Sequence, residues 1–482
     1  MTMRFAIIGA GMAGILATIK LREAGYDDIV VYEKADRVGG TWRENTYPGI
    51  ACDVPSHAYS YSFELNPEWS HRFSPGPEIQ AYFEGVADRH GVRERVRFGE
   101  EVVRCEFIDG RWHLRTERGT ADVVDVVIAA TGVLHHPNIP TFEGMDRFEG
   151  ACFHSARWDH SVPLDGRRVG VIGTGSTAVQ ITSALVDRVA HFSLFQRTAQ
   201  WVIQVDNPAF SEEERAAFRG DPSKVKGLHE YLSRSFREAF AAAVIDADSP
   251  KMRAIEDQCR ANLEQHVTDP VLREQLRPTY RAACKRLVAS PDFYEKIQHP
   301  NASLVTSPIE RIEPKGVRTA DGVLHELDVL VLATGFRVDR FVRPTVVTGR
   351  DGVDLDDVWR DGPIAYLSVA VPGFPNFFML NGPNGPVGNF SLIEVAEMQV
   401  GYILQLLEQV RAGRCAHVSP SWEATRNLEA ERREAAVGTV WTTGCNSWYL
   451  DKDGIPATWT FTFDRFCDEM ASPKLDAYEL AG

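Results

Sequence analysis

Short runs of apolar residues, each followed by a glycine-rich turn, set the pattern of this chain. Residues 5–8 are apolar and lead into Gly9-Ala-Gly11-Met-Ala-Gly14, after which residues 15–22 place apolar side chains at helical spacing. Residues 169–172 lead in the same way into Gly173-Thr-Gly175-Ser-Thr-Ala178. A buried strand, a tight turn and a helix are expected at both places. The pattern therefore predicts an α/β fold with two similar units.

Residues 207–283 follow a different pattern, because the alternation of strands and helices stops there. Segments 211–218, 228–240 and 252–259 repeat apolar side chains at the spacing of a helix. Prolines punctuate these segments, at Pro222, Pro250, Pro270 and Pro278. The sequence therefore predicts a small helical subdomain inside the second unit.

The first glycine-rich turn has the spacing G-x-G-x-x-G. Gly9 permits the turn, Gly11 lets the backbone approach a pyrophosphate, and Gly14 lets the helix pack close to the strand. The phosphates would meet the free N–H groups at the positive end of the helix. A second apolar run ends at Glu33, where an acid binds the ribose of an adenine dinucleotide. We therefore expect a Rossmann-like dinucleotide-binding domain.

The second turn differs at the position of the acid. Gly173, Gly175 and Ala178 keep the motif, which tolerates alanine at its last position. The strand expected at residues 191–195 is followed by Gln196-Arg197-Thr198, with an arginine in place of the acid. Arginine can clamp a 2′-phosphate with charge-assisted hydrogen bonds, whereas an acid would repel it. We expect NADPH at Arg197 and Thr198; a surface arginine without a partner is the alternative.

Two further apolar strands end in Ala-Thr-Gly, at residues 130–132 and 333–335. In the flavoprotein fold with two dinucleotide-binding domains, such strands close each nucleotide domain, which favours FAD at the first site. The order of elements predicts three units: an FAD-binding domain at 1–142 and 337–482, an NADPH-binding domain inserted in it at 143–206 and 284–336, and the helical subdomain at 207–283.

The segment between the two turns carries a longer pattern, F-x-G-x-x-x-H-x-x-x-W-D, formed by Phe148, Gly150, His154, Trp158 and Asp159. It resembles the fingerprint of type I Baeyer–Villiger monooxygenases, and a second match to that family lies in residues 39–53, G-G-x-W-x-x-x-x-Y-P-G-x-x-x-D. The resemblance runs along most of the chain. It implies a flavin enzyme that uses NADPH and O2 to insert one oxygen beside a ketone carbonyl, through a C4a-peroxyflavin, giving an ester or lactone.

The resemblance also implies the residues of the active site. Gly40 would hold the backbone near the FAD pyrophosphate, and Trp42 would pack beside the flavin. Asp53 would pair with an arginine, which the family's K-R-L places at Arg286, while Lys285 would contact the NADPH 2′-phosphate. Arg286 would stabilise the peroxide anion without titrating. The alternative is that Lys285 and Arg286 are two solvated basic residues.

Other positions are assigned less directly by the family match. Gly150 is expected to adopt an unusual backbone angle. His154 is expected near the nicotinamide, where it would couple domain movement to NADPH placement, with a role as catalytic base as the alternative. Trp448 and Tyr449, in a Ser-Trp-Tyr stretch, would face the substrate or a mobile loop, or would be core aromatics.

One departure from the family bears on the substrate. Residues 450–456 differ from the G-A-N-I-P of members that oxidise cyclic ketones and are more similar to the subgroup acting on aryl ketones. The nearest rival is a flavin monooxygenase that oxygenates nitrogen or sulfur, which usually lacks a tryptophan at position 158. A disulfide reductase is disfavoured because the chain has no redox C-x-x-C. A fold retained only for binding is disfavoured by the intact glycines.

Composition restricts the possible partners and location of the chain but identifies no reaction. The 482 residues carry a net charge of -15, which argues against nucleic acid and anionic membranes as partners. No apolar run is long enough to span a membrane, and no secretory signal precedes the first strand. Eight cysteines show neither C-x-x-C nor zinc spacing. We expect unpaired thiols, a cytoplasmic location, no metal, and a small ketone and O2 as partners.

Overall fold

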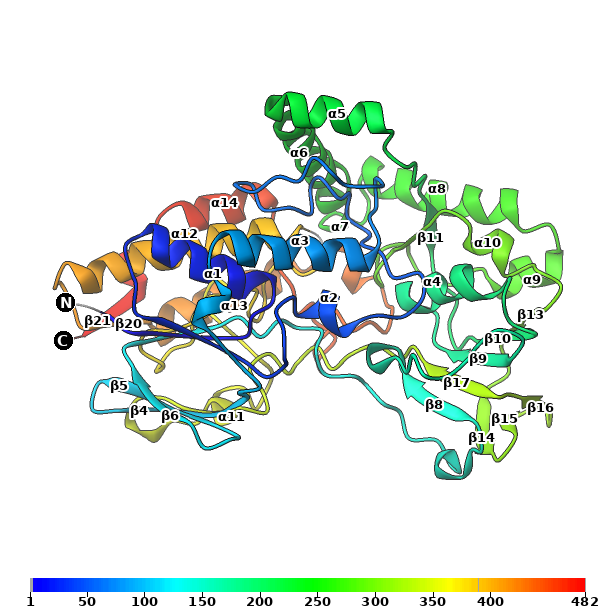
Figure 1. The fold of residues 1–482 in the computed structure, drawn as a ribbon, viewed down its shortest axis with the longest axis horizontal. Helices are drawn as coiled ribbons and strands as arrows, with labels where there is room; N and C mark the ends of the chain where they lie inside the picture. Colours follow the sequence, from blue (N-terminus) through cyan, green and yellow to red (C-terminus); the bar gives the residue numbers. More distant parts are fainter. Residues whose placement is uncertain (1–2, 389, 482) are drawn as a thin grey trace.

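Two parallel sheets form the framework of the chain (Figure 1). The computed structural model describes residues 3–388 and 390–481. The first sheet has the strand order β19-β7-β1-β2-β3. Its strands are β1 (Phe5–Ile8), β2 (Ile29–Glu33), β3 (Val96–Phe98), β7 (Val126–Ala129) and β19 (Phe377–Met379). A strand from late in the chain thus completes the sheet that the N-terminal residues begin.

The second sheet is formed by the middle of the chain, in the order β13-β10-β9-β17-β8. Its strands are β8 (Ala151–His154), β9 (Arg168–Ile172), β10 (His191–Phe195), β13 (Ala302–Val305) and β17 (Val329–Leu332). All four neighbouring pairs run parallel. Strands β1, β7 and β17 are buried along their whole length, because each sheet is covered by helices on one face and by a smaller sheet on the other. Burial on both faces explains their unbroken apolar sequences.

Helices cover one face of each sheet. In the first unit α1 (Met12–Glu23) contacts β1 and β2 as well as α3 (Gly76–Arg89) and α12 (Leu392–Arg411), and α14 (Phe463–Ala471) packs on α12. In the second unit α4 (Ser176–Leu185) starts directly after the second glycine-rich turn and contacts β10. The helix that follows each turn therefore lies against the sheet, as the sequence predicted.

Smaller sheets, which the apolar pattern did not predict, flank the framework. A four-stranded sheet contains β4 (Val102–Ile108), β5 (Arg111–Thr116), β6 (Ala121–Val124) and β18 (Val346–Thr348). A three-stranded sheet contains β14 (Ile309–Glu313), β15 (Gly316–Thr319) and β16 (Leu324–Glu326). Two pairs are β11 (Val202–Gln204) with β12 (Val288–Ser290), and β20 (His417–Pro420) with β21 (Tyr478–Ala481).

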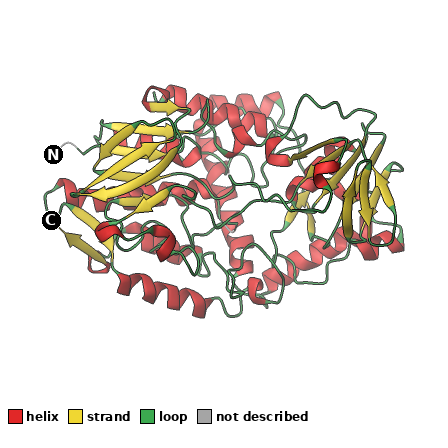
Figure 2. Cartoon of the chain, turned by 90° about the horizontal axis from the view of Figure 1, so that it is seen from below, coloured by secondary structure: helices red, strands yellow, loops and turns green. Residues whose placement is uncertain are grey.

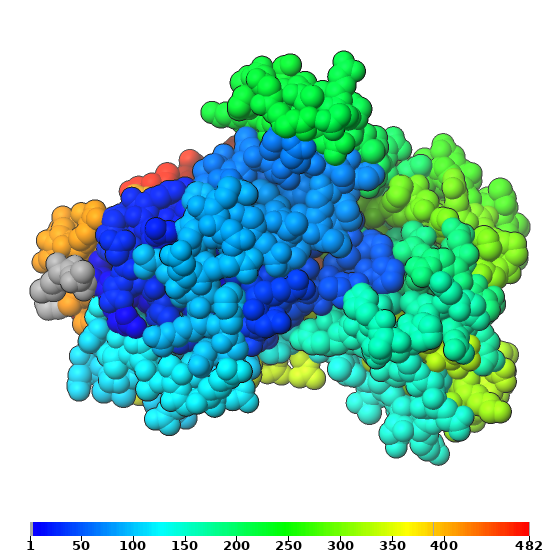
Figure 3. Space-filling view, in the orientation of Figure 1, coloured from blue at the N-terminus to red at the C-terminus, as the bar shows by residue number. Residues whose placement is uncertain are grey.

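The segment without strands is helical. It contains α5 (Glu212–Gly220), α6 (Pro222–Phe236), a π-helix (Arg237–Ala241), α7 (Ala242–Val244), α8 (Pro250–His266) and α9 (Pro270–Gln275). Three of the prolines open α6, α8 and α9 rather than only separating helices, because the first helical position needs no backbone N–H. Helices α5 and α6 project from the rest of the molecule in the space-filling view (Figure 3).

Further helices are α10 (Phe293–Lys296) and α11 (Leu355–Val358), with four residues each, and α13 (Trp422–Ala435), with 14 residues. Figure 2 shows the strands gathered in two groups with helices around and between them. The predicted fold class, two Rossmann-like sheets with a helical subdomain, is confirmed. The limits of the three domains stay a prediction, because only independent folding or movement of each unit would define them.

The cysteines correct one expectation. Cys284 and Cys445 form a disulfide with a Cα–Cα distance of 6.1 Å, whereas unpaired thiols were expected from the sequence. The two residues lie 161 positions apart, so spacing could not reveal the bond. The expectation that all eight cysteines are unpaired, as in a reducing compartment, is therefore wrong for Cys284 and Cys445.

Candidate active site

The first glycine-rich turn joins β1 to α1 in a conformation that requires glycine. Gly9 has a φ of +100°, and a Cβ there would lie 2.7 Å from the Ala130 oxygen. A Cβ on Gly14 would lie 1.9 Å from the Gly9 oxygen. Gly11 and Gly40 face each other, because a Cβ on Gly40 would lie 2.9 Å from the Gly11 Cα. These loops form a cradle of bare backbone, which suits a pyrophosphate.

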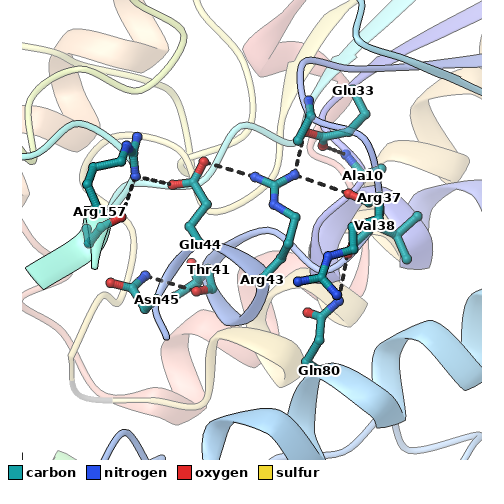
Figure 4. Close-up of polar contacts among 12 residues, drawn as sticks. Ala10, Glu33, Arg37, Val38, Thr41, Arg43, Glu44, Asn45, Gln80 and Arg157 are labelled. Atoms are coloured by element: carbon teal, nitrogen blue, oxygen red, sulfur yellow. Dashed lines mark hydrogen bonds and ion pairs between the residues drawn. The ribbon is translucent and has the colours of Figure 1, made fainter. Parts of the chain in front are cut away.

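Glu33 ends β2 beside this cradle, and Figure 4 shows its contacts. Its Oε2 accepts the Ala10 N–H at 2.8 Å, and its Oε1 accepts from Arg43 Nη1 at 2.9 Å. Arg43 also donates to Glu44 Oε1 at 2.9 Å, and Arg157 Nη1 lies 3.4 Å from Glu44 Oε2. Arg43 and Glu44 lie on α2 (Thr41–Glu44). Sequence reasoning found Glu33 but missed this row of alternating charges, since its members come from three separate segments.

The second glycine-rich turn repeats the design of the first. Gly173 has a φ of +124°, and a Cβ there would lie 2.2 Å from the Ala333 oxygen. Ala178 is buried in α4, while no atom lies within 4 Å of a Cβ placed on Gly175. In both turns the first glycine thus contacts the alanine of an Ala-Thr-Gly segment, which explains why that segment occurs twice.

Two cations lie on the cavity wall beside the second turn. Arg197 follows β10 and is exposed, and the neighbouring Thr198 oxygen accepts from Thr174 Oγ1 at 2.9 Å. Lys285 comes from the segment after the helical subdomain, and its Nζ lies 4.8 Å from the centre of the Tyr280 ring. Burial and the positive charge of Arg197 both lower the pKa of Lys285. Two cations held close together favour an anionic ligand.

Asp53 and Arg286, distant in the sequence, form an ion pair. Arg286 Nε and Nη2 both donate to Asp53 Oδ2, at 3.2 and 2.6 Å. The Asp53 carboxylate is the main cause that raises the pKa of Arg286, so the guanidinium keeps its charge. Both side chains line the cavity, and 36% of the Arg286 side chain is exposed.

One cavity of about 1150 Å³ joins these groups. Its wall includes Gly9, Gly11, Glu33, Gly40, Trp42, Asp53, Gly173, Gly175, Arg197, Thr198, Lys285 and Arg286. The indole of Trp42 is fixed there by a hydrogen bond from Nε1 to the Tyr59 hydroxyl at 3.2 Å. A pocket for one small molecule usually measures about 300–1,000 Å³. The volume therefore suits a site that holds more than one small molecule.

The fingerprint segment forms the edge strand β8, which pairs with β17. A Cβ on Gly150 would lie 2.4 Å from the Asp328 oxygen, and Gly150 does not have a positive φ. The expected unusual backbone angle is therefore wrong, and close approach of another strand is the reason for this glycine. Trp158 is buried and packs against Phe153, with ring centres 5.1 Å apart.

His154 is buried at the end of β8, and backbone groups occupy both of its ring nitrogens. Nδ1 accepts the Ala156 N–H at 3.1 Å, and Nε2 lies 3.1 Å from the Gly335 oxygen. Nε2 must therefore carry the proton and donate it. Burial lowers the pKa of His154, so the ring is neutral. Among the described residues that line the cavity, His154 does not occur.

The Tyr-Pro-Gly segment that leads to Asp53 packs against α4 of the second unit. The Tyr47 hydroxyl donates to Gln180 Oε1 at 2.8 Å, and Gln180 Nε2 donates to the Ala51 oxygen at 3.0 Å. A Cβ on Gly49 would lie 2.5 Å from the Gln180 oxygen. This motif therefore fixes Asp53 relative to the second nucleotide site, a role that its position near the first site had not suggested.

The Ser-Trp-Tyr stretch divides between cavity and core. Trp448 lines the cavity and is 37% exposed. Tyr449 is 4% exposed and lies in an apolar cluster with Trp441. Sequence analysis left both roles open, because neither residue type nor spacing told which ring would reach the cavity.

Known proteins similar to this chain cover it almost from end to end. An uncharacterized monooxygenase of Mycobacterium tuberculosis is 50% identical over 98% of this chain and 95% of its own length. A Baeyer–Villiger monooxygenase of Streptomyces coelicolor is 41% identical over 99% of this chain and 92% of its own length. The chain belongs to the type I Baeyer–Villiger monooxygenases.

Solved structures agree with this membership. Cyclohexanone monooxygenase from Rhodococcus sp. Phi1, bound to NADP+, is 31% identical and superimposes on this Baeyer–Villiger monooxygenase with a TM-score of 0.89, covering 100% of this chain and 99% of that chain. Residues 6–213 match the family model of pyridine nucleotide-disulphide oxidoreductases. The missing C-x-x-C still separates the chain from the disulfide reductases, which need that redox pair.

The described part of this Baeyer–Villiger monooxygenase contains neither a membrane-spanning helix nor a group of metal-ligating side chains. Over residues 3–388 and 390–481, no helix is long and apolar enough to cross a bilayer. In the same residues, no three His, Cys, Asp or Glu side chains form a group that could bind a metal ion.

Proposed function

We propose that the chain binds FAD and NADPH and uses O2 to insert one oxygen atom next to a ketone carbonyl, giving an ester or a lactone. The observation that carries this proposal is the Asp53–Arg286 pair, which faces the same cavity as both glycine-rich turns. A fixed positive charge in such a place stabilises negative charge on an oxygen atom of a reacting group. Membership of the Baeyer–Villiger family supports the same reaction.

FAD fits the first site. The cradle of Gly9, Gly11 and Gly40 presents backbone to a pyrophosphate, and the carboxylate of Glu33 would hold the adenosine ribose. Trp42 would lie beside the isoalloxazine ring. When bound, FAD supplies the hydride acceptor and the site of O2 activation.

NADPH fits the second site. Gly173 and Gly175 leave the N-terminus of α4 open to a pyrophosphate. Arg197 would clamp the 2′-phosphate, with Thr198 beside it and Lys285 as a second cation. An adenine dinucleotide without the 2′-phosphate would not use these two charges, and this is the physical basis for a preference for NADPH.

Few side chains would take part directly in the reaction. Arg286 would stabilise the developing oxyanion, and Asp53 would orient its guanidinium. No nucleophilic side chain is needed, because the cofactor carries the difficult step. His154 would stabilise the second unit rather than act as a base, since both ring nitrogens hold backbone groups of that unit, at Ala156 and Gly335.

The experiment that tests the function uses the FAD-loaded protein with NADPH, O2 and a panel of substrates. The panel contains aryl, linear and cyclic ketones, a thioether and an amine, and mass spectrometry identifies the products. We expect esters or lactones, from aryl or linear ketones before cyclohexanone. Only sulfoxide or N-oxide, with every ketone recovered, would instead support a flavin monooxygenase that oxygenates nitrogen or sulfur.

Replacing Gly14 by alanine is expected to remove most of the FAD. The new Cβ would meet the Gly9 oxygen at 1.9 Å, so the turn must open or α1 must move. The purified variant should contain less flavin by absorbance and should unfold at a lower temperature. Gly227→Ala in α6, where no atom lies within 4 Å of the Cβ position, is the matched control. Full flavin content in Gly14→Ala would contradict the role given to this turn.

Binding of NADPH is expected to weaken as the pH rises. The weakening should begin at a lower pH than the pKa of an ordinary lysine would give. Burial and Arg197 lower the pKa of Lys285, so its ammonium loses the proton earlier as the pH rises. kcat/KM for NADPH should fall through this range, because it reports groups of the free enzyme. In Lys285→Arg the fall should disappear, since arginine stays charged. The same fall with NADH as with NADPH would show that another group titrates.

A further inference from the structure

The carboxylate of Glu33 is buried, and groups of the protein use most of its hydrogen-bonding capacity. Oε1 accepts the Ala35 N–H and Arg43 Nη1, each at 2.9 Å, and Oε2 accepts the Ala10 N–H at 2.8 Å. A carboxylate has about four acceptor sites, two on each oxygen. Oε1 is therefore fully used, and one site on Oε2 remains for a ribose hydroxyl. Which oxygen faces the cofactor thus depends on the groups that hold the other one.

Arg43 is the cation that balances this carboxylate. Its side chain is 8% exposed. Nη1 donates to Glu33 Oε1 and to the Arg37 main-chain oxygen at 3.1 Å, and Nη2 donates to Glu44 Oε1 at 2.9 Å. A buried carboxylate costs free energy unless an opposite charge and hydrogen bonds compensate it. Arg43 provides both, and three oxygen atoms fix its guanidinium in place.

The charges of Glu33, Arg43 and Glu44 do not cancel. Two carboxylates and one guanidinium leave an excess negative charge beside Gly40, where the anionic pyrophosphate of FAD is expected. Like charges repel each other more strongly in a buried place, because water screens them less. Glu44 also competes with Glu33 for the same guanidinium. A further cation beside Glu44 would reduce both effects.

Arg157 of the second unit supplies this cation (Figure 4). It ends a short 3-10 turn, Ser155–Arg157, and its Nη1 lies 3.4 Å from Glu44 Oε2. The side chain is 50% exposed, so this ion pair is the weak member of the row. A second contact joins the same two segments, since His160 Nε2 lies 2.8 Å from Thr46 Oγ1. The fingerprint segment thus docks on α2 and on the residues that follow it.

We propose that Arg43 is a positioning residue for the FAD site. It holds Glu33 in the orientation that leaves Oε2 free for the adenosine ribose, and Glu44 connects it to Arg157, whose charge completes the row from the second unit. This inference rests on the proposed function, because it requires FAD at the first glycine-rich turn. It adds that α2 joins the ribose site to the second unit.

The first test exchanges the bound flavin. FAD-loaded protein is incubated with a graded excess of FMN, which lacks the adenosine and its ribose, and chromatography measures which flavin stays bound at equilibrium. In Arg43→Met, the carboxylate of Glu33 is no longer held in place and should bind the ribose less well. The ratio of FMN to FAD at half exchange should fall at least about tenfold, the loss expected for one hydrogen bond to a charged group.

This half-exchange ratio separates positioning from a general structural effect. Displacement of α2 would also move Trp42 and the pyrophosphate cradle, and it would weaken the binding of FMN and FAD alike. Arg432→Met is the matched control, because Arg432 is buried, pairs with Glu429 at 2.7 Å and is not among the described residues on the cavity wall. It should leave the ratio unchanged. An unchanged ratio in Arg43→Met as well would overturn the positioning role.

Arg43→Lys keeps the buried charge and covers the case in which Arg43→Met does not fold. A lysine ammonium is a point charge without the planar fork, so it cannot hold Glu33 and Glu44 in the geometry of the wild-type protein. The half-exchange ratio should fall, although by less than in Arg43→Met. A wild-type ratio in Arg43→Lys would overturn the role given to the guanidinium.

The second test concerns the contribution of the second unit. Arg157→Ala leaves Glu44 without its outer partner. Glu44 should then compete more strongly with Glu33 for Arg43, and the ribose site should lose part of its hold on FAD. The half-exchange ratio should fall about two- to fivefold at low ionic strength, the range for an exposed ion pair, and by less at high ionic strength.

Two further variants control this second test. Arg188 has a side chain that is 54% exposed and pairs with Asp165, and it does not belong to the described part of the cavity wall. Arg188→Ala should therefore leave the ratio unchanged, and an equal fall in Arg188→Ala and Arg157→Ala would overturn the link to the second unit. In a Glu44→Gln background, Arg157→Ala should have little further effect. The full effect in that background would overturn the role of Glu44.

The flavin exchange also distinguishes this inference from the proposed function. A wild-type protein that binds no FAD would refute the proposed function. A wild-type protein that binds FAD but oxidises no ketone would refute the proposed reaction and leave the exchange measurement intact. A wild-type protein that binds FAD, with the same half-exchange ratio as Arg43→Met, would refute only the positioning role of Arg43.

Discussion

Arg286→Ala is expected to lose ester formation while NADPH still reduces FAD. The guanidinium is charged, because Asp53 raises its pKa, and it faces the cavity. Removal of one preorganised group that stabilises an oxyanion costs about a hundred- to a thousandfold in kcat. We expect at least this loss, since alanine also leaves the Asp53 carboxylate without its partner. Stopped-flow absorbance measures flavin reduction, and product analysis measures oxygen insertion.

Arg281→Ala is the matched control for this experiment. Arg281 precedes Arg286 in the same segment, pairs with Glu256 at 3.0 Å and is not one of the described residues on the cavity wall. It should leave ester formation near the wild-type rate. Arg286→Lys keeps a charge but loses the planar fork, so it should retain only part of the activity. Normal ester formation by Arg286→Ala would refute the role of this arginine.

Arg197→Ala is expected to lower kcat/KM for NADPH at least about a hundredfold and to leave kcat/KM for NADH nearly unchanged. The guanidinium would make two charge-assisted hydrogen bonds to the 2′-phosphate, and each such bond contributes about 1.5–3 kcal/mol. NADH lacks this phosphate and therefore loses nothing. Steady-state kinetics with both coenzymes measures the change.

Arg188→Ala provides the control for a lost positive charge. Arg188 lies between α4 and β10 and pairs with Asp165 at 2.9 Å, away from the cavity. This variant should keep the preference for NADPH. The double variant Arg197→Ala and Lys285→Ala should not add its two losses in full, because both cations would share one phosphate. Equal KM values for NADPH and NADH in the wild-type protein would refute the Arg197 assignment.

The local parts of the site could be predicted because their contacts lie within one short segment. Gly9 and Gly14 touch each other across a single turn, and Glu33 ends the next strand of the same unit. The order strand, turn and helix follows from the apolar periodicity, so both sites were found in the sequence. The small flanking sheets were not found, because their strands are half exposed and polar residues interrupt their apolar sequences.

Other features depend on segments that meet only after folding. The Asp53–Arg286 contact was expected from the family pattern, but apolar spacing alone carries no signal for it. The row from Glu33 through Arg43 and Glu44 to Arg157 had no sequence signal either (Figure 4). The same is true of the disulfide, which corrects the expectation of unpaired thiols.

The sequence by itself determined the fold class, the two dinucleotide turns and the family, because glycine spacing and apolar periodicity act over a few residues and the fingerprint is contiguous. Only the tertiary structure decided that His154 holds backbone groups, that Gly150 serves close packing, and that Trp448 rather than Tyr449 lines the cavity. These outcomes depend on which loops the two sheets bring together. A one-dimensional pattern does not contain that information, since the partners lie far apart along the chain and are joined only by packing between units.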